Sequence, residues 1–275
     1  MNQNTKRSLM CWLALSPLIL IILFPFAVML FVSLTPGNEV YQYPPSWIPS
    51  RFAWENYTTM WNETGFGQAL VNSLYVTVLS TLVVLFVAIP AAYSLARFDF
   101  KGQTAYQFFL IVTQMLSPIL LMVGLFKFVV WLGLVDDLNA LVLIYAGFGI
   151  AFAVWMLTNF FRTIPLDLEQ TAWLEGAGWF YSLRKVFLPL ATPAISVAAT
   201  FTFIFAWNEY STALVVMRSP ENITLQVKVA SLVGVYTPKW EQIMAAIFLT
   251  TVPVAIAFSW FQKHLVTGLS AGAVK

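Results

Sequence analysis

The stretch PLDLEQTAWLEGAGWFYSLRKVFLPLATP, residues 165–193, decides the fold that we expect, because it is a charged interruption in a chain made otherwise of apolar runs. Asp167 and Gln170 have the spacing of a capping box at the start of a short helix. Gly176 predicts the turn that ends this helix. A second short helix follows, and Pro189 stops or kinks it. Two short helices that are too polar to cross a bilayer indicate a segment lying at a membrane surface.

The composition excludes several classes of protein. Sixty per cent hydrophobic and nine per cent charged residues do not make a soluble domain, and a net charge of +2 is too small for a nucleic-acid-binding surface. The single Cys11 forbids an internal disulfide or a cysteine metal cluster. The single His264 has no Ser, Asp or Cys constellation around it, so no catalytic or metal site is expected. The phosphate-binding pattern Gly-x-x-x-x-Gly-Lys-Ser/Thr is absent, so we expect neither ATP hydrolysis nor a cofactor in this chain.

Six apolar runs are long enough to cross a membrane as helices. The first exceeds the apolar core of a secretory signal, so we expect an uncleaved span, with a cleaved signal as the alternative. Pro118 inside the third run predicts a kink within one continuous span. The expected fold class is therefore an all-α integral membrane protein with six transmembrane helices. The runs cover about residues 11–33, 70–95, 108–129, 138–161, 194–217 and 243–262.

Basic residues predict the orientation of these spans, because Lys and Arg gather on the cytoplasmic side. A cytoplasmic N-terminus places nine of them inside and five outside, so we expect both termini and the segment 165–193 in the cytoplasm. The nine are Lys6, Arg7, Arg97, Lys101, Arg162, Arg184, Lys185, Lys263 and Lys275, and the five are Arg51, Lys127, Arg218, Lys228 and Lys239.

Glu209 is the one acidic residue inside an expected span. A charge in the membrane centre costs about 2.5–3.5 kcal/mol on insertion scales, so this carboxylate should face protein or water. It either belongs to a translocation path together with Asn208, with a gating or proton-binding role, or is a structural anchor bonded to a neighbouring helix or to Asn208. The sequence leaves both interpretations open.

The segment resembles the coupling loop of ABC-importer permeases. The pattern of that loop is Glu-Ala-Ala, three residues, Gly, nine residues, Ile, one residue and Leu-Pro. This chain departs from it in having Gln, Thr and Val in place of Glu, the first Ala and Ile. The matching positions, all at the same spacing, are Gln170, Thr171, Ala172, Gly176, Val186, Leu188 and Pro189.

Further stretches resemble the MalG-type permeases of carbohydrate ABC importers, and together they cover nearly the whole chain. The C-terminal stretch GLSAGAVK makes the resemblance specific to sugar importers. The similar stretches are residues 72–74, 91–98, 207–209, 224–225 and 268–275.

This resemblance implies the type I ABC-importer permease fold and a set of partners. The chain would pair with a second permease, two ATPase subunits and an extracytoplasmic sugar-binding protein, in a bacterial or archaeal cytoplasmic membrane. ATP and Mg²⁺ would be bound by the ATPase, and this chain would be non-catalytic. The substrate implied is a disaccharide, oligosaccharide, polyol or sugar conjugate.

The resemblance also implies roles for particular residues. In the coupling segment, Glu169 would offer the ATPase the carboxylate that Gln170 lacks. An outer loop would reach the binding protein, although a plain connector is the alternative, and an extended C-terminal tail would thread between the ATPase subunits. The coupling residues are Glu169, Gln170, Thr171, Ala172, Glu175, Gly176, Ala177, Leu188 and Pro189; the outer loop contributes Tyr236, Thr237, Pro238 and Trp240, and the tail Gly268, Gly272 and Lys275.

The sequence thus divides into residues 1–70 with the first span and outer loop, residues 71–262 with the transmembrane domain and its coupling segment 165–190, and a tail at 263–275. The rival function is a single-chain secondary transporter that uses Glu209 for proton coupling. That rival predicts internal repeats and a discontinuous helix pair, and we find no convincing repeat. A loop packed on its own bundle is the structural alternative for the coupling segment, and a membrane enzyme lacks a catalytic constellation.

Overall fold

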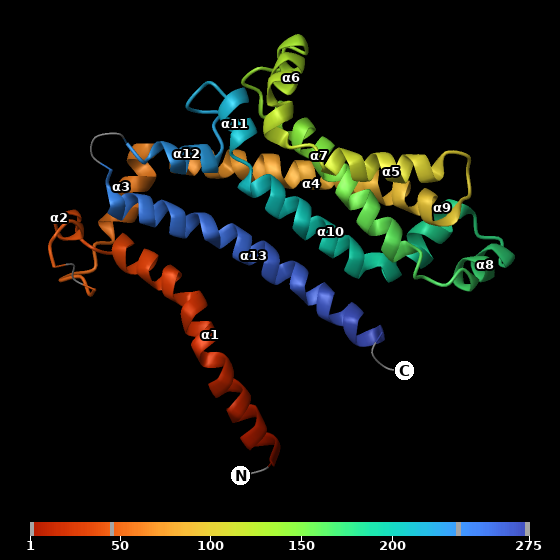
Figure 1. Ribbon diagram of the computed structural model, residues 1–275, viewed down its shortest axis with the longest axis horizontal. Coiled ribbons are helices and arrows are strands. Elements are labelled where there is room, and N and C mark those ends of the chain that lie inside the picture. Colours follow the sequence, from red (N-terminus) through yellow and green to blue (C-terminus); the bar gives the residue numbers. More distant parts are fainter. Residues whose placement is uncertain (1–2, 45–46, 235–237, 273–275) are drawn as a thin grey trace. The chain divides into compact units, whose positions relative to one another are not determined.

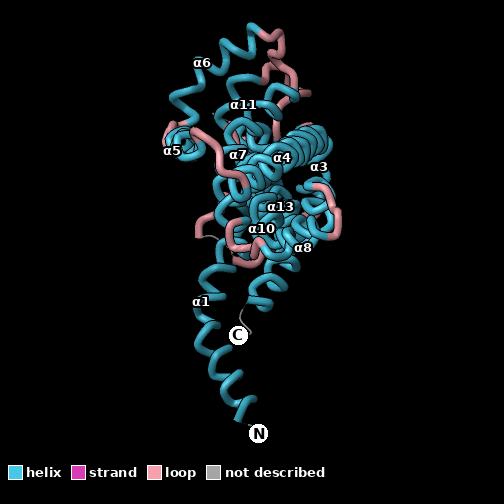
Figure 2. Tube along the Cα trace, turned by 90° about the vertical axis from the view of Figure 1, so that its right-hand side faces the viewer, coloured by secondary structure: helices cyan, strands magenta, loops and turns pink. Residues whose placement is uncertain are grey.

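The computed structural model describes residues 3–44, 47–234 and 238–272. The described chain is helical and contains no strand (Figure 2). The helices are α1 (Gln3–Ser33), α2 (Gly37–Val40), α3 (Glu55–Thr64), α4 (Phe66–Arg97), α5 (Gln103–Gln114), α6 (Pro118–Trp131), α7 (Leu138–Phe161), α8 (Asp167–Leu174), α9 (Trp179–Tyr181), the π-helix η1 (Ser182–Phe187), α10 (Leu188–Asn208), α11 (Ser211–Val216), α12 (Leu225–Ser231) and α13 (Trp240–Gly272).

Five helical stretches in the described chain are long and apolar enough to cross a membrane, or six if the bent pair α5 and α6 is one span. The all-helical class with five to six spans is therefore confirmed. The fourth expected span coincides with α7 at both ends. The sixth continues beyond its expected end near residue 262, because α13 runs to Gly272. The expectation of an extended tail from Gly268 is accordingly wrong as far as Gly272.

The third expected span is broken rather than kinked. The helices α5 and α6 are bent by 99° relative to each other, and Pro118 is the first residue of α6. Ser117 before it is extended, with φ −68° and ψ 128°. A proline disfavours the helical conformation of the preceding residue, whereas its own missing N–H costs nothing in the first turn of a helix. The expectation of one continuous span is corrected for this reason.

The fifth expected span also differs. A helical stretch begins already at Ser182 and ends at Asn208, where Glu209 takes an extended conformation before the short helix α11. Pro189 does not stop the second short helix, because the ring lies in the first turn of α10. Glu209 consequently lies at a helix break and not within a span.

The chain forms two compact units, of which the larger comprises Gln68–Val227 and Pro253–Lys275. Its core lies between α4, α7 and α10, which Figure 1 shows packed near one another. Small side chains allow this approach, among them Ala88, Ala153 and Ala198, each fully buried. At Gly149, a Cβ atom would lie 3.0 Å from a methyl group of Val84, so the glycine is needed for the close contact of α7 with α4.

One end of this unit is joined by polar contacts between α4 and the loop that precedes α12. The Asn72 amide donates to the carbonyl oxygens of Glu221 and Ile223, at 2.7 and 3.0 Å. The Ser73 hydroxyl accepts from the backbone N–H of Leu225 at 2.7 Å. Two stretches that the sequence analysis singled out separately, 72–74 and 224–225, are therefore in direct contact.

Asp136 joins the turn between α6 and α7 to the segment after α11. Its φ of 64° is in the left-handed region. The carboxylate accepts from the backbone N–H groups of Arg218 and Ser219, at 2.8 and 3.0 Å, and from the Ser219 hydroxyl. The hydrogen bond from Ser219 is the main reason why the pKa of Asp136 is lowered to about 2. The expected turn at residues 136–137 is confirmed, and its carboxylate is a structural ligand of the backbone.

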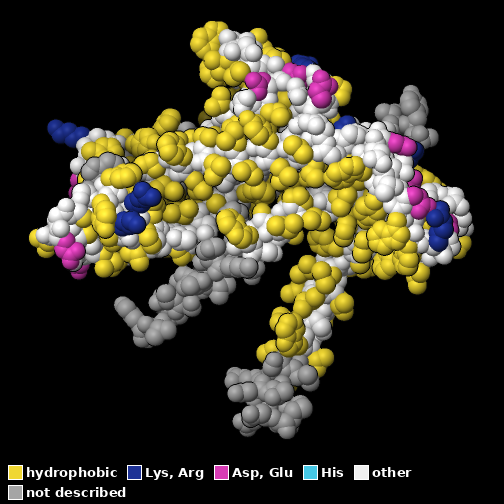
Figure 3. Space-filling model, turned by 180° about the vertical axis from the view of Figure 1, so that it is seen from behind, with side chains coloured by type: hydrophobic (Ala, Val, Ile, Leu, Met, Phe, Trp, Pro, Cys, Tyr) yellow, Lys and Arg dark blue, Asp and Glu magenta, His cyan; other side chains and the backbone are white. Residues whose placement is uncertain are grey.

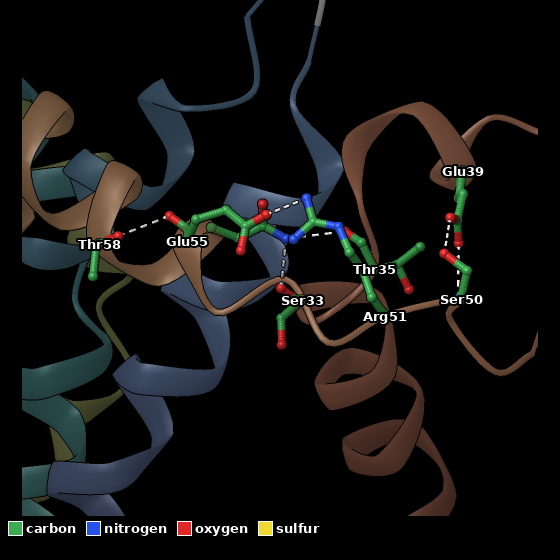
Figure 4. A network of polar contacts seen from close by, with 8 residues as sticks. Ser33, Thr35, Glu39, Ser50, Arg51, Glu55 and Thr58 are labelled. Carbon is green, nitrogen blue, oxygen red and sulfur yellow. Dashed lines mark hydrogen bonds and ion pairs between the residues drawn. The ribbon is translucent and has the colours of Figure 1, made fainter.

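The smaller unit comprises Met1–Gly67 and Lys228–Val252. The domain boundaries predicted from the sequence did not group these two segments together. Asn56 of α3 donates to the carbonyl oxygens of Ser33 and Thr35, both at 2.9 Å, and so fixes the end of α1 (Figure 4). Glu39 accepts from the backbone N–H and the hydroxyl of Ser50. The unit is thus held by hydrogen bonds across its loops.

The surface of the larger unit suits a lipid environment. Phe86 on α4 is 82% exposed, and many other exposed side chains are apolar. Figure 3 shows hydrophobic side chains over much of the visible face, with charged side chains confined to a few clusters. Exposed apolar area of this extent is expected where lipid or another membrane subunit covers the helices.

Asp136 gives a prediction on pH and stability. Because the folded-state pKa is depressed, the stabilisation is complete above about pH 5 and is lost as the pH falls from about 3.8 towards 2. We expect Asp136→Asn to cost about 1 kcal/mol at pH 7, a value that allows for solvent screening of this mostly accessible group. Thermal unfolding in detergent should show that the wild type is more stable than Asp136→Asn at pH 7, and that this difference in stability is smaller at pH 3. An advantage of the same size at both pH values would contradict the assignment, and Ser219→Ala should show a smaller effect.

Candidate coupling site

The helix α8 lies at one end of the larger unit, and Figure 1 shows α6 and α11 towards the opposite end. The connection from α7 passes through Ile164, which is buried against the core of the unit. Pro165 then favours an extended residue before it and ends the preceding turn. The segment therefore leaves α7 at a fixed point rather than through a free loop.

The start of α8 differs from the predicted capping box. Leu166 is the N-cap residue, and no side chain caps the helix there. Asp167 and Glu169 lie in the first turn, where carboxylates interact favourably with the helix dipole. The Thr171 hydroxyl donates to the carbonyl of Asp167 at 2.8 Å. The capping-box prediction is wrong because the helix includes Asp167 itself.

The end of α8 is the glycine turn that the sequence predicts. Gly176 has a φ of +85° and follows the C-cap residue Glu175. Its N–H bonds to the carbonyl of Trp173, and the N–H of Ala177 bonds to the carbonyl of Ala172, both at 3.0 Å. These two bonds form a Schellman motif. The motif needs a residue in the left-handed backbone conformation, which glycine adopts without strain. The position of the turn is confirmed.

Glu169 faces the interior of this unit. Its carboxylate forms an ion pair with the Arg97 guanidinium, in which both side chains are almost fully buried, 3% exposed for Arg97 and 1% for Glu169. The other carboxylate oxygen accepts from the Tyr93 hydroxyl at 2.7 Å. Glu169 therefore does not offer a free carboxylate to a partner, which corrects the role expected for it. The pair instead joins α8 to the end of α4.

Aromatic rings enclose this ion pair. Phe187 of η1 is fully buried, and the Arg97 guanidinium carbon lies 5.0 Å from the centre of its ring. The ring centroid of Phe187 lies 5.0 Å from that of Tyr93 and 4.7 Å from that of Phe161, both in edge-on arrangements. We call Tyr93, Arg97, Phe161, Glu169 and Phe187 the anchor cluster. It brings α4, α7, α8 and η1 together in one desolvated contact.

The anchor cluster is a constraint on position more than a source of stability. Desolvating two charges costs several kcal/mol, which their attraction and extra hydrogen bonds must offset. Here part of the remaining bonding capacity is used, because Arg97 also donates to the carbonyl of Ile164 at 2.8 Å. Removing one partner would leave a buried charge uncompensated. The cluster therefore fixes where α8 lies relative to α4.

The remaining coupling candidates are on the accessible side of the segment. Leu174 is 89% exposed, and Leu168 and Trp173 are also exposed. Apolar side chains around a short polar helix form a surface suited to a protein partner. Of the predicted residues, Gln170, Thr171, Glu175, Gly176 and Pro189 are exposed, whereas Ala172, Ala177 and Leu188 are half-buried.

The return from this segment into the membrane passes through η1 and Pro189. A proline has no N–H for the carbonyl four residues earlier, and its ring needs space there. The wider π-helical turns at Ser182–Phe187 come directly before it. The same turns direct Phe187 into the anchor cluster. Leu188 and Pro189 therefore open α10 at a position set by that cluster.

Glu209 and Asn208 lie at the other break. The Glu209 carboxylate accepts from the Tyr145 hydroxyl at 2.8 Å and from the backbone N–H of Thr212 at 2.9 Å. Asn208 donates to the carbonyl of Ile204, whereas the described hydrogen bonds of the Glu209 carboxylate are with Tyr145, Thr212 and Ala213. Of the two interpretations left open, the contacts agree with an anchor bonded to a neighbouring helix, namely Tyr145 of α7. The carboxylate also bonds the start of α11 after the break.

The other predicted contact residues are placed only in part. Tyr236, Thr237 and Lys275 lie outside the described residues. The Pro238 carbonyl accepts from the Tyr41 hydroxyl, and Trp240 begins α13. Their contacts with a binding protein stay a prediction, as do those of Gly268 and Gly272 with an ATPase.

Sequence reasoning missed the anchor cluster apart from Glu169. Arg97 entered the analysis only as a basic residue at the end of a span, and its partner is 72 positions away. The sequence did offer one indication of this ion pair. The second span ends with a basic residue, and the first turn of α8 has two acidic residues that could pair with it. Which acid turns inwards depends on the rotation of an eight-residue helix, and that follows from packing.

The described chain is a bundle of apolar helices with a polar segment at one end. The sequence profile of binding-protein-dependent transport system inner membrane components matches residues 85–271. The chain therefore belongs to this family and is an inner-membrane component of an ABC transporter.

Relatives and solved structures agree. The chain is 32% identical over 276 residues to the inner membrane ABC transporter permease protein YcjP of Escherichia coli K12, covering 100% of this chain and 99% of the relative. It is 33% identical over 264 residues to the trehalose/maltose transport system permease protein MalG of Thermococcus litoralis, covering 93% and 92%. A crystal structure of a bacterial ABC transporter involved in alginate import matches in fold with a TM-score of 0.81 at 23% identity, over 96% of this chain and 98% of that one.

The ion pair gives a prediction on stability. We expect Arg97→Met and Glu169→Leu each to cost about 3–5 kcal/mol, because each leaves a buried charge unpaired. The double variant should recover most of that loss, since it removes both charges from the same site. Thermal unfolding of the four proteins in detergent measures the coupling between the two positions.

The exposed ion pair of Arg51 with Glu55 is the matched control, with side chains 65% and 50% exposed. The same four-protein comparison there should show no measurable coupling, because solvent screens the charges. Equal coupling energies at the two pairs would show that the 97–169 pair is not buried as described.

Proposed function

We propose that this chain is a permease subunit of an ATP-driven importer and forms, with a second permease, the translocation pathway for a sugar delivered by a binding protein. The observation that supports this most is the coupling site: α8 is fixed to the membrane helices by a buried ion pair on one side and is apolar and exposed on the other. A helix held in this way can pass on a displacement. A loop free to move would absorb it.

The coupling step follows from this arrangement. An ATPase bound to the exposed face of α8, with Leu168, Trp173 and Leu174 in contact, would move α8 when ATP closes the ATPase pair. Because Glu169 is paired with Arg97, that movement is transferred to α4, and through Phe187 to α10. The segment would lie in the cytoplasm, together with both termini, as the basic residues predict. ATP and Mg²⁺ would be bound by the ATPase.

The sugar assignment is supported by relatives and by the resemblance of the chain to carbohydrate permeases. The relative from Thermococcus litoralis is named for trehalose and maltose, and another from Agrobacterium fabrum, 33% identical, for sulfoquinovosyl glycerol. The substrate proposed is accordingly a disaccharide, oligosaccharide, polyol or sugar conjugate. A binding protein is the partner that the family name specifies. Tyr236, Thr237, Pro238 and Trp240 would contact it, and the C-terminal tail would contact the ATPases.

Gly176 gives the test of this function. A Cβ atom there would have no heavy atom of this chain within 4 Å, so bulk alone disturbs nothing inside the subunit. Asn tolerates the left-handed conformation better than other residues with side chains. We therefore expect Gly176→Asn to insert and fold, yet to retain about tenfold less ATPase on purification, because the added side chain meets the partner surface.

Gly102→Asn is the matched control. Gly102 has a φ of +93° and equally no neighbour within 4 Å of its Cβ position, but it lies between α4 and α5. That variant should co-purify with the ATPase like the wild type. Normal ATPase retention and transport by Gly176→Asn would be evidence against α8 as the coupling helix.

A further inference from the structure

A cavity of about 340 Å³ lies beside the break between α5 and α6. Its volume is at the lower end of the range of ligand sites, roughly 300–1,000 Å³. The lining combines apolar rings with amide and hydroxyl groups, the mixture that small-molecule sites use for affinity and orientation. The lining residues are Thr113, Gln114, Leu116, Pro118, Phe148, Gly149, Phe152, Phe201, Thr202 and Phe205.

Four phenylalanines form one wall of the cavity. Phe148 and Phe152 are four residues apart on α7, and Phe201 and Phe205 have the same spacing on α10, so each pair lies on one helix face. The ring centroids of Phe148 and Phe205 are 6.3 Å apart, and those of Phe152 and Phe201 are 5.6 Å apart. Phe201 is 54% exposed, so part of its ring is open to a ligand. The apolar C–H face of a sugar ring stacks on such surfaces.

Polar side chains also line the cavity. The Gln114 amide donates to the carbonyl of Phe148 at 3.2 Å and, as an exposed side chain, keeps further bonding capacity for a ligand. Thr202 is only 3% exposed, and its hydroxyl has no hydrogen-bond partner among the described residues. The hydroxyl oxygen itself is withdrawn from the cavity surface, so Gln114 is the polar group that a ligand can reach.

The helix break between α5 and α6 is a third indication that this cavity is a ligand site. Irregular backbone at membrane depth is tolerated where it is covered by protein or lines a cavity. Discontinuous helices mark substrate sites in other transporters for this reason. The interruption between Gln114 and Pro118 lies at this cavity, and both residues line it. The lining residues include no Lys, Arg, Asp or Glu. A charged ligand would therefore be desolvated there without compensation.

We propose that this cavity is a sugar subsite of the translocation pathway in this subunit, and that it takes an uncharged sugar ring stacked on Phe201 and Phe205 and hydrogen-bonded by Gln114. The proposal rests on the proposed function, since it assigns the substrate chemistry of that pathway. It predicts that no acidic sugar binds at this subsite. The residues bind the sugar directly.

The test uses the complete importer, reconstituted from this chain with its second permease, ATPase and binding protein. A panel of neutral and acidic mono-, di- and trisaccharides and polyols is first titrated onto the binding protein. The tightest-binding member, radiolabelled, is then used for uptake into proteoliposomes at saturating binding protein. ATP hydrolysis stimulated by the liganded binding protein is measured in parallel.

Phe201→Ala and Gln114→Leu should each reduce the sugar taken up per ATP hydrolysed by about tenfold, because each removes one stacking face or hydrogen-bonding group. Stimulated ATP hydrolysis should be retained, since the coupling site is intact. Phe201→Tyr keeps the ring and should restore uptake. Phe86→Ala removes an equally large exposed ring outside the cavity and should transport like the wild type. Phe201→Leu replaces Phe201→Ala if the latter does not assemble.

Three outcomes would overturn the proposal. Unchanged uptake in both cavity variants would show a space filled by lipid, while leaving the permease function intact. Uptake of an acidic sugar by the wild type, with no neutral sugar transported, would also leave that function intact but exclude this subsite. Absence of both binding and uptake for the whole panel would remove the sugar-importer function and the subsite with it.

Discussion

The buried ion pair between Arg97 and Glu169 is the interaction on which the proposed function depends. It joins two segments that are 72 positions apart, and both side chains are withdrawn from solvent. Two apolar residues could stabilise this contact as well, but an ion pair fixes geometry, because a shifted helix would leave two desolvated charges. The surface helix α8 is thereby made part of the membrane bundle.

Two interruptions in the membrane helices have a different physical basis. Between α5 and α6 the chain turns at Ser117 and Pro118, beside an aromatic cavity. After α10 it turns at Glu209, whose carboxylate bonds Tyr145 of α7 and the start of α11. The first break adjoins a cavity large enough for a small ligand. The second break is filled by the side chain of Glu209. Only the first therefore has room for a substrate.

The sequence predicted the parts that depend on local patterns. The span at 138–161 follows from uninterrupted hydropathy, and the turn at Gly176 follows from glycine's access to positive φ. The break at Pro118 was missed because apolar residues lie on both sides of it, and the break at Glu209 because the polar residues 208–212 were included in one span. The inward rotation of Glu169 was missed because neighbouring acids on a short helix look alike until the packing of Phe187 and Tyr93 selects one. Local sequence patterns thus determine where helices and turns lie, and contacts distant in sequence determine the role of each side chain.

The central claim is that α8 moves with α4 as one body. The most direct measurement is the distance between spin labels at Asp167→Cys and Phe86→Cys, both exposed, in a Cys11→Ser background of the assembled importer. The account predicts one narrow distance distribution that is the same with and without ATP. In the Arg97→Met, Glu169→Leu double variant it predicts a broad distribution that changes with nucleotide. A nucleotide-dependent distance in the otherwise wild-type importer, or an unchanged narrow distribution in the double variant, would contradict it.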